Sequence, residues 1–393
     1  MQLAKLNFLR VADINDTRTG GMGRFMNYIS DELRGDGHQV EHLFADGLKS
    51  HVPVKLRRFV VPWIIVSEIG RRLENGRKYD AVEIHEPSAA AYCLARRVCR
   101  HLPPVIVVSY GLESRCHASM LRYYSDKNFE VSFKQRFSPY SVIAQAEMAV
   151  SMADQVTVET TEDLEYLIYK RGVSPDRITV VNGGITPAFL NAPVLSQDAQ
   201  GILFLATWID RKGIKDVVPA LAAVAEQIPG LPITIAGFGV PESVVLNDFP
   251  GHVQNRLRLV PKVDGEENLL RLYRSHSIFL APSVFEGQLL TMLEAAAAGL
   301  AIVTTNCCGM KDFIRDEDNG LLVRPGDVEG LTNALMKLIN NPSFAMKLGN
   351  TARQDSLAFT WRRSADQFLD AVSKCHLTSK IVPLYQKKHQ FFG

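Results

Sequence analysis

Two glutamates with seven residues between them are the first pair in this sequence that could do chemistry. The stretch "VFEGQLLTMLEAAAAGLAIVTTN" (284–306) contains Glu286 and Glu294. Glu286 precedes an apolar helical pattern, and Glu294 falls one to two turns inside it. The start of such a helix carries free amides and a positive dipole end, which together attract anions. An alternative is that Glu286 only complements the helix dipole and that Glu294 is an exposed helix residue.

Cationic residues and glycines elsewhere in the sequence could also bind an anion. Arg211 and Lys212 lie in "LATWIDRKGIKDVV" (205–218), between a predicted strand and a predicted helix. A cation in such a loop can hold a diphosphate that gains charge as a bond breaks. The turn "GGMG" (20–23), with Gly20 and Gly21, lets backbone amides approach a phosphate closely. A solvated surface pair and a tight turn without a ligand are the alternatives.

The elements around these residues alternate between strand and helix. Apolar runs typical of buried strands occur at 5–13, 38–45, 79–87, 103–111, 153–160 and 176–184, and again at 201–207, 231–239, 255–263, 275–283, 299–306 and 319–326. Helical patterns lie between most of them, which predicts parallel sheets with covered faces.

The pattern predicts an α/β protein with two Rossmann-like domains, as expected for 393 residues. Residues 1–185 form the first domain, 186–200 a linker, and 201–360 the second domain. Residues 361–393 form a C-terminal helix and tail that we expect to return toward the first domain. The ligand should lie at the carboxyl ends of the strands.

Composition indicates which classes of partner and which cellular compartment to expect. Lys plus Arg is 44 and Asp plus Glu is 42, so the net charge is +2, which gives no reason to expect nucleic acid. Six cysteines without a C-x-x-C pair suggest reduced thiols and a cytoplasmic protein. The N-terminus has no signal-peptide core. The basic and apolar run 55–73 is compatible with peripheral contact to an anionic membrane, or with one ordinary strand and helix. The oligomeric state is not predicted.

Several motifs together resemble one family. They are "GGMGRFMNYISDELRGDGHQV", "PDRITVVNGGI", "DRKGIKDVVPAL", "ITIAGFG", "IFLAPSVFEGQLLTMLEAAAAGLAIVTTNCCGMKDFI", "NGLLVRPGD" and the closing "FTWRRSADQFLDAV". They cover nearly the whole chain and are similar to a family 4 glycosyltransferase of the GT-B fold. The Glu286–Glu294 spacing is the most specific of them.

The resemblance implies an activity and its substrates. A retaining enzyme of this kind moves a sugar from a nucleoside-diphosphate sugar, of UDP or GDP type, to a hydroxyl of a glycan or lipid-linked acceptor. It needs no metal and no other cofactor. The rival hypotheses are a nucleotide-sugar hydrolase or epimerase, or a non-catalytic binder of the same fold. A dinucleotide oxidoreductase is disfavoured, because "GFGVPE" (237–242) lacks the third glycine of G-x-G-x-x-G.

The resemblance also implies roles for single residues. Glu286 would lie against the donor sugar. Glu294 would bind the ribose hydroxyls, since a carboxylate can accept two hydrogen bonds from a cis-diol. Lys212, helped by Arg211, would stabilise the leaving diphosphate. The remaining donor contacts would come from Gly20, Gly21, Val263, Gly287, Gln288, Leu289 and Leu290.

On the acceptor side, three residues follow predicted strands. His85 and Glu86 in "EIHEP" would reach the acceptor, although a structural histidine is an alternative. Tyr110 stands where many family members have histidine, and either hydrogen-bonds the sugar or packs as a strand-end aromatic. Two further departures are Thr207, where the family usually has arginine, and Leu289, which replaces a small residue or proline. Asp316 and Asp318 could suggest a metal site, but we interpret "RDEDNG" as a turn.

Overall fold

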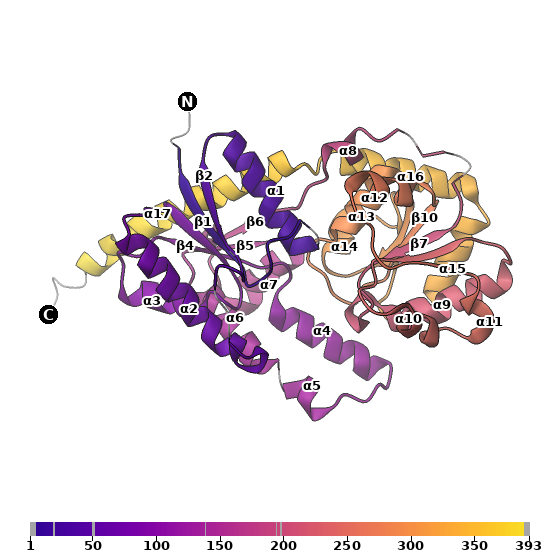
Figure 1. Ribbon diagram of the computed structural model, residues 1–393, viewed down its shortest axis with the longest axis horizontal. Helices are drawn as coiled ribbons and strands as arrows, with labels where there is room; N and C mark the ends of the chain where they lie inside the picture. Colours follow the sequence, from indigo (N-terminus) through magenta and orange to yellow (C-terminus); the bar gives the residue numbers. More distant parts are fainter. Residues whose placement is uncertain are drawn as a thin grey trace. The chain divides into compact units, whose positions relative to one another are not determined.

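The computed structural model describes residues 5–18, 20–48, 52–137, 139–193, 195–196 and 199–388. The tail residues 389–393, and residues 194, 197 and 198 of the expected linker, lie outside the described residues. The chain forms two compact units (Figure 1). The first comprises the described residues within Met1–His117, Ser132–Gly183 and Trp361–Gly393, and the second those within Ala118–Val131 and Gly184–Thr360.

The first unit is built on a six-stranded parallel sheet with the order β2-β1-β3-β4-β5-β6. Its strands are β1 (Asn7–Val11), β2 (Gln39–Leu43), β3 (Ala81–His85), β4 (Val105–Val108), β5 (Gln155–Val158) and β6 (Ile178–Val180). The chain runs outward from β1 to β2 and then returns to the other side at β3. The topological switch point of this sheet therefore lies between β1 and β3.

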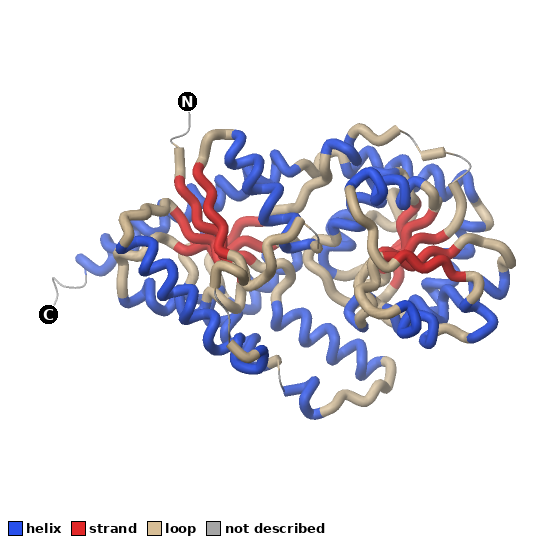
Figure 2. The backbone as a smooth tube through the Cα atoms, viewed as in Figure 1, coloured by secondary structure: helices blue, strands red, loops and turns tan. Residues whose placement is uncertain are grey.

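Helices cover both faces of this sheet, as Figure 2 shows by the blue tubes around the red strands. They are α1 (Gly21–Gly35), α2 (Val54–Glu74), α3 (Ala90–Val98), the start of α4 (Glu113–Asp126), α5 (Phe133–Phe137), α6 (Tyr140–Met152), α7 (Thr161–Arg171), the short η1 (Pro175–Arg177) and α17 (Trp361–Lys388). The last of these, α17, packs against α1, β5 and β6. Its Phe368 meets Phe8 of β1 edge-on, with ring centroids 5.5 Å apart.

The second unit repeats this plan with the order β12-β11-β10-β7-β8-β9, again all parallel. Its strands are β7 (Ile202–Leu205), β8 (Ile233–Ala236), β9 (Leu257–Val260), β10 (Ile278–Ala281), β11 (Ala301–Thr305) and β12 (Leu321–Val323). The chain builds outward from β7 through β9, then crosses back to β10. The switch point here lies between β7 and β10.

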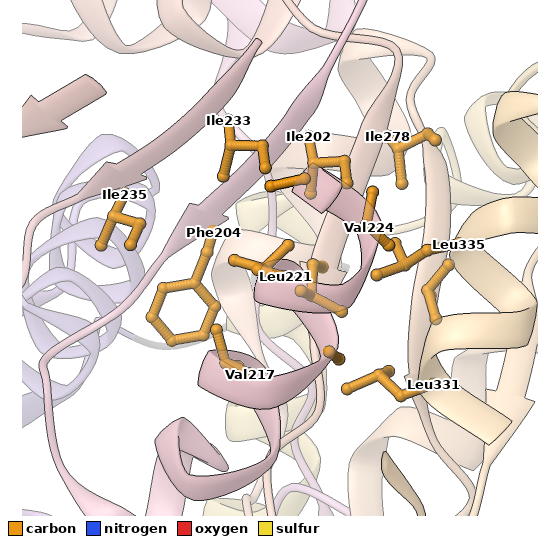
Figure 3. Packing of buried hydrophobic residues seen from close by; sticks show 14 of the residues in the cluster. Ile202, Phe204, Val217, Leu221, Val224, Ile233, Ile235, Ile278, Leu331 and Leu335 are labelled. Atoms are coloured by element: carbon orange, nitrogen blue, oxygen red, sulfur yellow. The ribbon is translucent and has the colours of Figure 1, made fainter. Parts of the chain in front are cut away.

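The helices of the second unit enclose an apolar core. They are the rest of α4, α8 (Pro187–Leu190), η2 (Asp210–Lys212), α9 (Ile214–Gln227), α10 (Glu242–Asp248), α11 (Gly251–Gln254), α12 (Glu266–Arg274), α13 (Leu290–Ala298), α14 (Cys308–Phe313), α15 (Val328–Ile339) and α16 (Pro342–Ser356). Figure 3 shows how α9 and α15 meet the sheet, through Ile202, Phe204, Val217, Leu221, Val224, Ile233, Leu331 and Leu335. Strands buried on both faces carry continuous apolar runs, which is why their positions could be predicted.

Two expectations need correction. The run 55–73 is not a strand followed by a helix, because it lies entirely within the single helix α2. The segment Ala118–Val131 does not group with the residues around it in sequence, but with the second unit. Among the described residues, no helix is both long and apolar enough to cross a membrane.

Candidate functional site

The loop that carries Arg211 and Lys212 is held against the loop that follows β10. Both loops leave the carboxyl ends of paired strands at the switch point of the second sheet. Gly213, directly after Lys212, has a φ of 76°, and a methyl group there would overlap the Pro282 carbonyl oxygen. The backbone N–H of Val284 donates to the Arg211 carbonyl at 2.8 Å. Only glycine allows this close approach, so the Lys-Gly pair fixes the position of both loops.

Glu286 forms ion pairs with both cations of the first loop. Its Oε1 lies 2.7 Å from Lys212 Nζ, and its Oε2 lies 3.2 Å from Arg211 Nη1. Glu286 is only 7% exposed, so its carboxylate is largely shielded from bulk water, whereas the Arg211 side chain is 35% exposed. A lysine ammonium has three donors, and a single carboxylate oxygen does not occupy all of them. The cluster can therefore hold an anion and a polyhydroxylated group side by side.

Glu294 is buried, which rules out the alternative of an exposed helix residue. It is 1% exposed, and its Oε2 accepts a hydrogen bond from the Tyr273 hydroxyl at 3.0 Å. The same hydroxyl lies 3.1 Å from the Thr291 carbonyl oxygen. A carboxylate buried inside a helix is costly unless it is hydrogen-bonded. Tyr273 supplies such a bond and fixes the orientation of the carboxyl group.

The segment between the two glutamates leads into helix α13. Leu289 is the N-cap residue of this nine-residue helix and makes no side-chain capping bond. Leu289 and Leu290 are buried, and Gln288 is half-buried. Gly287 is backed by α14, because a methyl group on Gly309 would overlap the Gly287 carbonyl oxygen.

The remaining predicted donor residues lie on other elements. Val263 is half-buried and lies three residues after β9, at the edge of the second sheet. Gly20 and Gly21 belong to the first unit. Gly20 is the N-cap of α1 with a φ of 82°, and a Cβ at either glycine would have no heavy atom within 4 Å. The turn thus leaves open space at the helix start.

The first unit brings its three predicted residues together at the carboxyl ends of β3 and β4. The rings of His85 and Tyr110 stack with centroids 5.5 Å apart and an interplanar angle of 21°. Phe25 meets the Tyr110 ring edge-on at 5.1 Å. The Tyr110 hydroxyl is buried and has no hydrogen-bond partner within the described residues. Burial and nearby Glu83 raise the pKa of Tyr110, so the hydroxyl stays protonated.

Glu86 is almost fully buried beside this pair. Its Oε1 accepts hydrogen bonds from Ser109 Oγ at 2.7 Å and from the backbone N–H of Glu113 at 3.3 Å. Burial raises the pKa of Glu86 to about 8, although the Ser109 bond opposes the shift. Burial also lowers the pKa of His85 to about 4. Near pH 7 both side chains are therefore predominantly uncharged, and the site can exchange hydrogen bonds with hydroxyl groups.

Asp316 and Asp318 lie in a turn. Asp316 Oδ1 accepts from the backbone N–H of Leu322 at 2.9 Å, and Asp318 Oδ2 accepts from Arg315 Nε at 2.8 Å. In the part of the chain that the structure describes, no group of three or more His, Cys, Asp or Glu residues could hold a metal. Thr207, exposed in the loop after β7, gives that loop no third cation.

Two residues outside the predicted set act on the predicted site residues. Tyr273 orients Glu294, and Asp210 begins the turn that carries Arg211 and Lys212. Tyr273 stands in none of the quoted motifs and reaches Glu294 across 21 residues, whereas Asp210 begins the motif "DRKGIKDVVPAL" but gives no local sign of its own partner. A nonlocal partner of this kind becomes visible only when the register of the fold is known.

Two six-stranded sheets, each with its residues of interest at a topological switch point, define a two-domain α/β protein of the GT-B type. Comparisons agree with this class. The model described as "Glycosyltransferase Family 4" matches residues 19–189, and that described as "Glycosyl transferases group 1" matches residues 199–341. The chain belongs to the family 4 glycosyltransferases.

Among similar curated proteins are a glycogen synthase of Mycobacterium tuberculosis and a D-inositol 3-phosphate glycosyltransferase of Saccharomonospora viridis. The first is 31% identical over 208 residues, covering 52% of this chain and 49% of the relative. The second is 26% identical over 266 residues, covering 62% of this chain and 61% of the relative. The alignments therefore span only about half to three-fifths of these relatives.

Solved structures extend the likeness of fold over most of the chain. Sucrose-phosphate synthase from Thermosynechococcus elongatus has a TM-score of 0.74 and 20% identity, covering 93% of this chain and 97% of that one. Anabaena HepE, in complex with UDP and glucose, has a TM-score of 0.68 and 15% identity, covering 94% and 99%. At these identities the likeness establishes the shared fold.

Proposed function

We propose that this protein is a retaining glycosyltransferase that uses a nucleoside-diphosphate sugar of UDP or GDP type. The observation that carries the proposal is the cluster of Lys212, Arg211 and Glu286 at the switch point of the second sheet, beside the start of α13. Cations and helix amides suit a diphosphate, and a carboxylate beside them suits sugar hydroxyls. The structures of HepE with UDP and UDP-glucose support a donor of this class.

In this proposal the second unit binds the donor and stabilises the leaving group. Lys212, Arg211 and the amides from Gly287 to Leu290 hold the diphosphate as negative charge accumulates on it. Glu286 accepts hydrogen bonds from the donor sugar. Glu294, held by Tyr273, binds the ribose hydroxyls.

The two glutamates do not form an acid–nucleophile pair in this mechanism. Glu286 is paired with two cations, and Glu294 is buried in the helix. A retaining hydrolase needs two carboxyl groups about 5 Å apart that flank the scissile bond. We propose instead that the leaving phosphate oxygen takes the acceptor proton during attack on the same face, and that no metal is required.

The first unit holds the acceptor in this proposal. Glu86 and His85, both uncharged near pH 7, exchange hydrogen bonds with hydroxyl groups of a glycan or lipid-linked acceptor. Tyr110 orders His85 by stacking rather than by reaching the sugar, because its hydroxyl is buried and its ring contacts both His85 and Phe25.

A donor panel tests the proposal. UDP-glucose, GDP-mannose and ADP-glucose are incubated with the protein in EDTA, with and without glycan acceptors, and release of the nucleoside diphosphate is measured. We expect release from one donor that an acceptor accelerates. Release that no acceptor changes would favour a hydrolase. Turnover that is lost in EDTA and restored by Mg²⁺ or Mn²⁺ would contradict the metal-independent mechanism.

Membrane contact through residues 55–73 is a further part of the proposal. Leu56, Phe59 and Trp63 are 52%, 46% and 57% exposed and lie on one face of α2. Arg58 lies over the Phe59 ring, with its guanidinium carbon 5.0 Å from the centroid. Exposed apolar residues beside arginine suit an anionic bilayer surface.

Liposome co-sedimentation tests this contact. We expect binding to vesicles that contain phosphatidylserine, and loss of binding in the double variant Phe59→Ser/Trp63→Ser. Val98→Ser, at an exposed apolar residue of α3, is the matched control. Equal sedimentation of wild type and the double variant would contradict the contact.

A further inference from the structure

A segment that interrupts the first unit in sequence packs beside the candidate phosphate-binding turn. Residues Ala118–Val131 belong to the second unit. They include the second half of α4, with Tyr123 and Tyr124, and Lys127 just beyond it. Three contacts join this segment to the turn η2 and to the first turn of α9.

The first contact acts on the turn itself. The Tyr124 hydroxyl donates to Asp210 Oδ2 at 2.8 Å. Asp210 begins η2 and lies two residues before Lys212. Its other oxygen is 3.8 Å from Lys215 Nζ. Burial and Asp210 raise the pKa of Tyr124, so its hydroxyl remains a donor across physiological pH.

The second and third contacts act on the helix that follows. Asp216, in the first turn of α9, is 1% exposed and lies 2.9 Å from Lys127 Nζ. It also accepts from the backbone N–H of Gly326 at 3.2 Å. Lys215 lies over the Phe129 ring, with its Nζ 5.0 Å from the centroid. The segment thus contacts residues on both sides of Lys212 and Gly213 in sequence, namely Asp210 before them and Lys215 and Asp216 after them.

The turn has few internal bonds to hold its shape. The backbone N–H of Lys212 donates to the Ile209 carbonyl, and that of Gly213 donates to the Asp210 carbonyl, each at 2.9 Å. These bonds leave the Asp210 side chain free to rotate unless another group holds it. An unheld carboxylate two residues from Lys212 is an anion that can compete with a diphosphate for the same cations.

We propose that Tyr124 is a positioning residue that holds the Asp210 carboxylate away from the diphosphate site, and that residues 118–131 are a structural part of the donor site. The inference rests on the function proposed for Lys212. Tyr124 does not touch the substrate in this account. It acts through Asp210.

Steady-state kinetics of Tyr124→Phe test the inference. The donor used is the nucleotide sugar of the panel that the wild-type protein consumes. Loss of the hydroxyl should raise the donor KM about tenfold, as expected for a lost hydrogen bond to a charged group, with a smaller change in kcat. The melting temperature should fall by only a few degrees, because the ring of Tyr124 stays in place. Tyr169→Phe removes an exposed hydroxyl in α7 and is the matched control.

Two double variants separate this role from a merely structural one. Asp210→Asn removes the competing charge, so Tyr124→Phe/Asp210→Asn should recover a KM close to wild type. In a Lys212→Ala background, Tyr124→Phe should have little further effect. The inference would be overturned if Asp210→Asn did not restore the donor KM of Tyr124→Phe. It would also be overturned if Tyr124→Phe raised the KM equally in the wild-type and Lys212→Ala backgrounds.

The outcome also distinguishes this inference from the proposed function. Wild-type turnover in Lys212→Ala would overturn the proposed function and this inference with it. Impaired turnover in Lys212→Ala, together with a wild-type KM in Tyr124→Phe, would overturn this inference alone.

Discussion

Glu294 is a buried carboxylate with one oxygen already held by Tyr273. We expect Glu294→Ala to weaken nucleoside-diphosphate binding by about 1.5–3 kcal/mol, because hydrogen bonds from the ribose to a charged group are lost. Calorimetry with UDP, GDP and ADP measures this. Glu294→Gln keeps the shape and one acceptor, so its loss should be smaller. Wild-type affinity in Glu294→Ala would remove this residue from the site.

Glu86 gives the protein a predictable dependence on pH. Its pKa is raised to about 8 in the folded protein, against an ordinary value of 4.5. Between these values the unfolded chain releases the proton and the folded chain keeps it. Stability from this group is therefore greatest below pH 4.5 and falls as the pH rises toward 8, by an amount on the order of a few kcal/mol.

Glu86→Gln should remove this dependence, because an amide does not titrate. We expect the variant to gain stability over wild type as the pH rises from 5.5 to 8.5. Urea unfolding of both proteins at these two pH values measures the gain. The comparison cancels the opposite trend from His85, whose lowered pKa acts equally in both proteins. Parallel pH profiles would show that Glu86 ionises normally.

Residue types could be predicted from the sequence, but their partners could not. The Glu286–Glu294 spacing and the Lys212-Gly213 pair identify the candidate site. The ion pair between Glu286 and Lys212 joins residues from two loops, and it depends on β7 and β10 being neighbours. Likewise, nothing local shows that Tyr110 stacks on His85 instead of facing a ligand.

At the scale of elements, the turn before α9 depends on Gly213. Alanine there would combine a left-handed φ of 76° with overlap of the Pro282 carbonyl oxygen. Gly172, at the end of α7, has a φ of 65°, but a methyl group there would meet no heavy atom within 4 Å. We expect Gly172→Ala to cost about 1–2 kcal/mol in unfolding free energy, from the left-handed backbone alone.

Gly213→Ala should cost more than Gly172→Ala and should also weaken nucleoside-diphosphate binding, since it displaces Lys212. Denaturant unfolding and calorimetry of both variants measure these two effects. Equal stability loss in the two variants, with unchanged binding, would mean that the turn tolerates a shift away from Pro282.

Strands were easier to predict than the grouping of helices. Each of the twelve apolar runs contains a strand, because parallel strands buried on both faces need continuous apolar sequence. The helix α2 was harder, because a strand followed by a helix was one interpretation of its residues 55–73. The place of Ala118–Val131 in the second unit depends on Tyr124 and Lys127 meeting Asp210 and Asp216, which are about ninety residues away in sequence.

At the scale of the whole molecule, the same plan occurs twice. Each sheet has six parallel strands, and in each the chain crosses back next to its first strand. The candidate acceptor residues His85 and Glu86 follow β3 at one switch point. The candidate donor cluster follows β7 and β10 at the other. Alternation of strands and helices predicts the two domains, whereas the sugar, base and acceptor depend on side chains that no motif specifies.

Steady-state turnover of Lys212→Ala, with the melting temperature as the folding control, tests the central claim that the Lys212 cluster drives departure of the diphosphate. Lys212 lies in a loop turn, so its truncation leaves no core cavity. Losing one preorganised donor to developing charge costs roughly 10²–10³ in kcat. Thr207 stands where the family usually has arginine, so we predict a loss in kcat near the upper end of that range for Lys212→Ala. We predict an intermediate loss in Arg211→Ala and an unchanged melting temperature in Lys212→Ala. Near-wild-type kcat in Lys212→Ala with an unchanged melt would contradict the account.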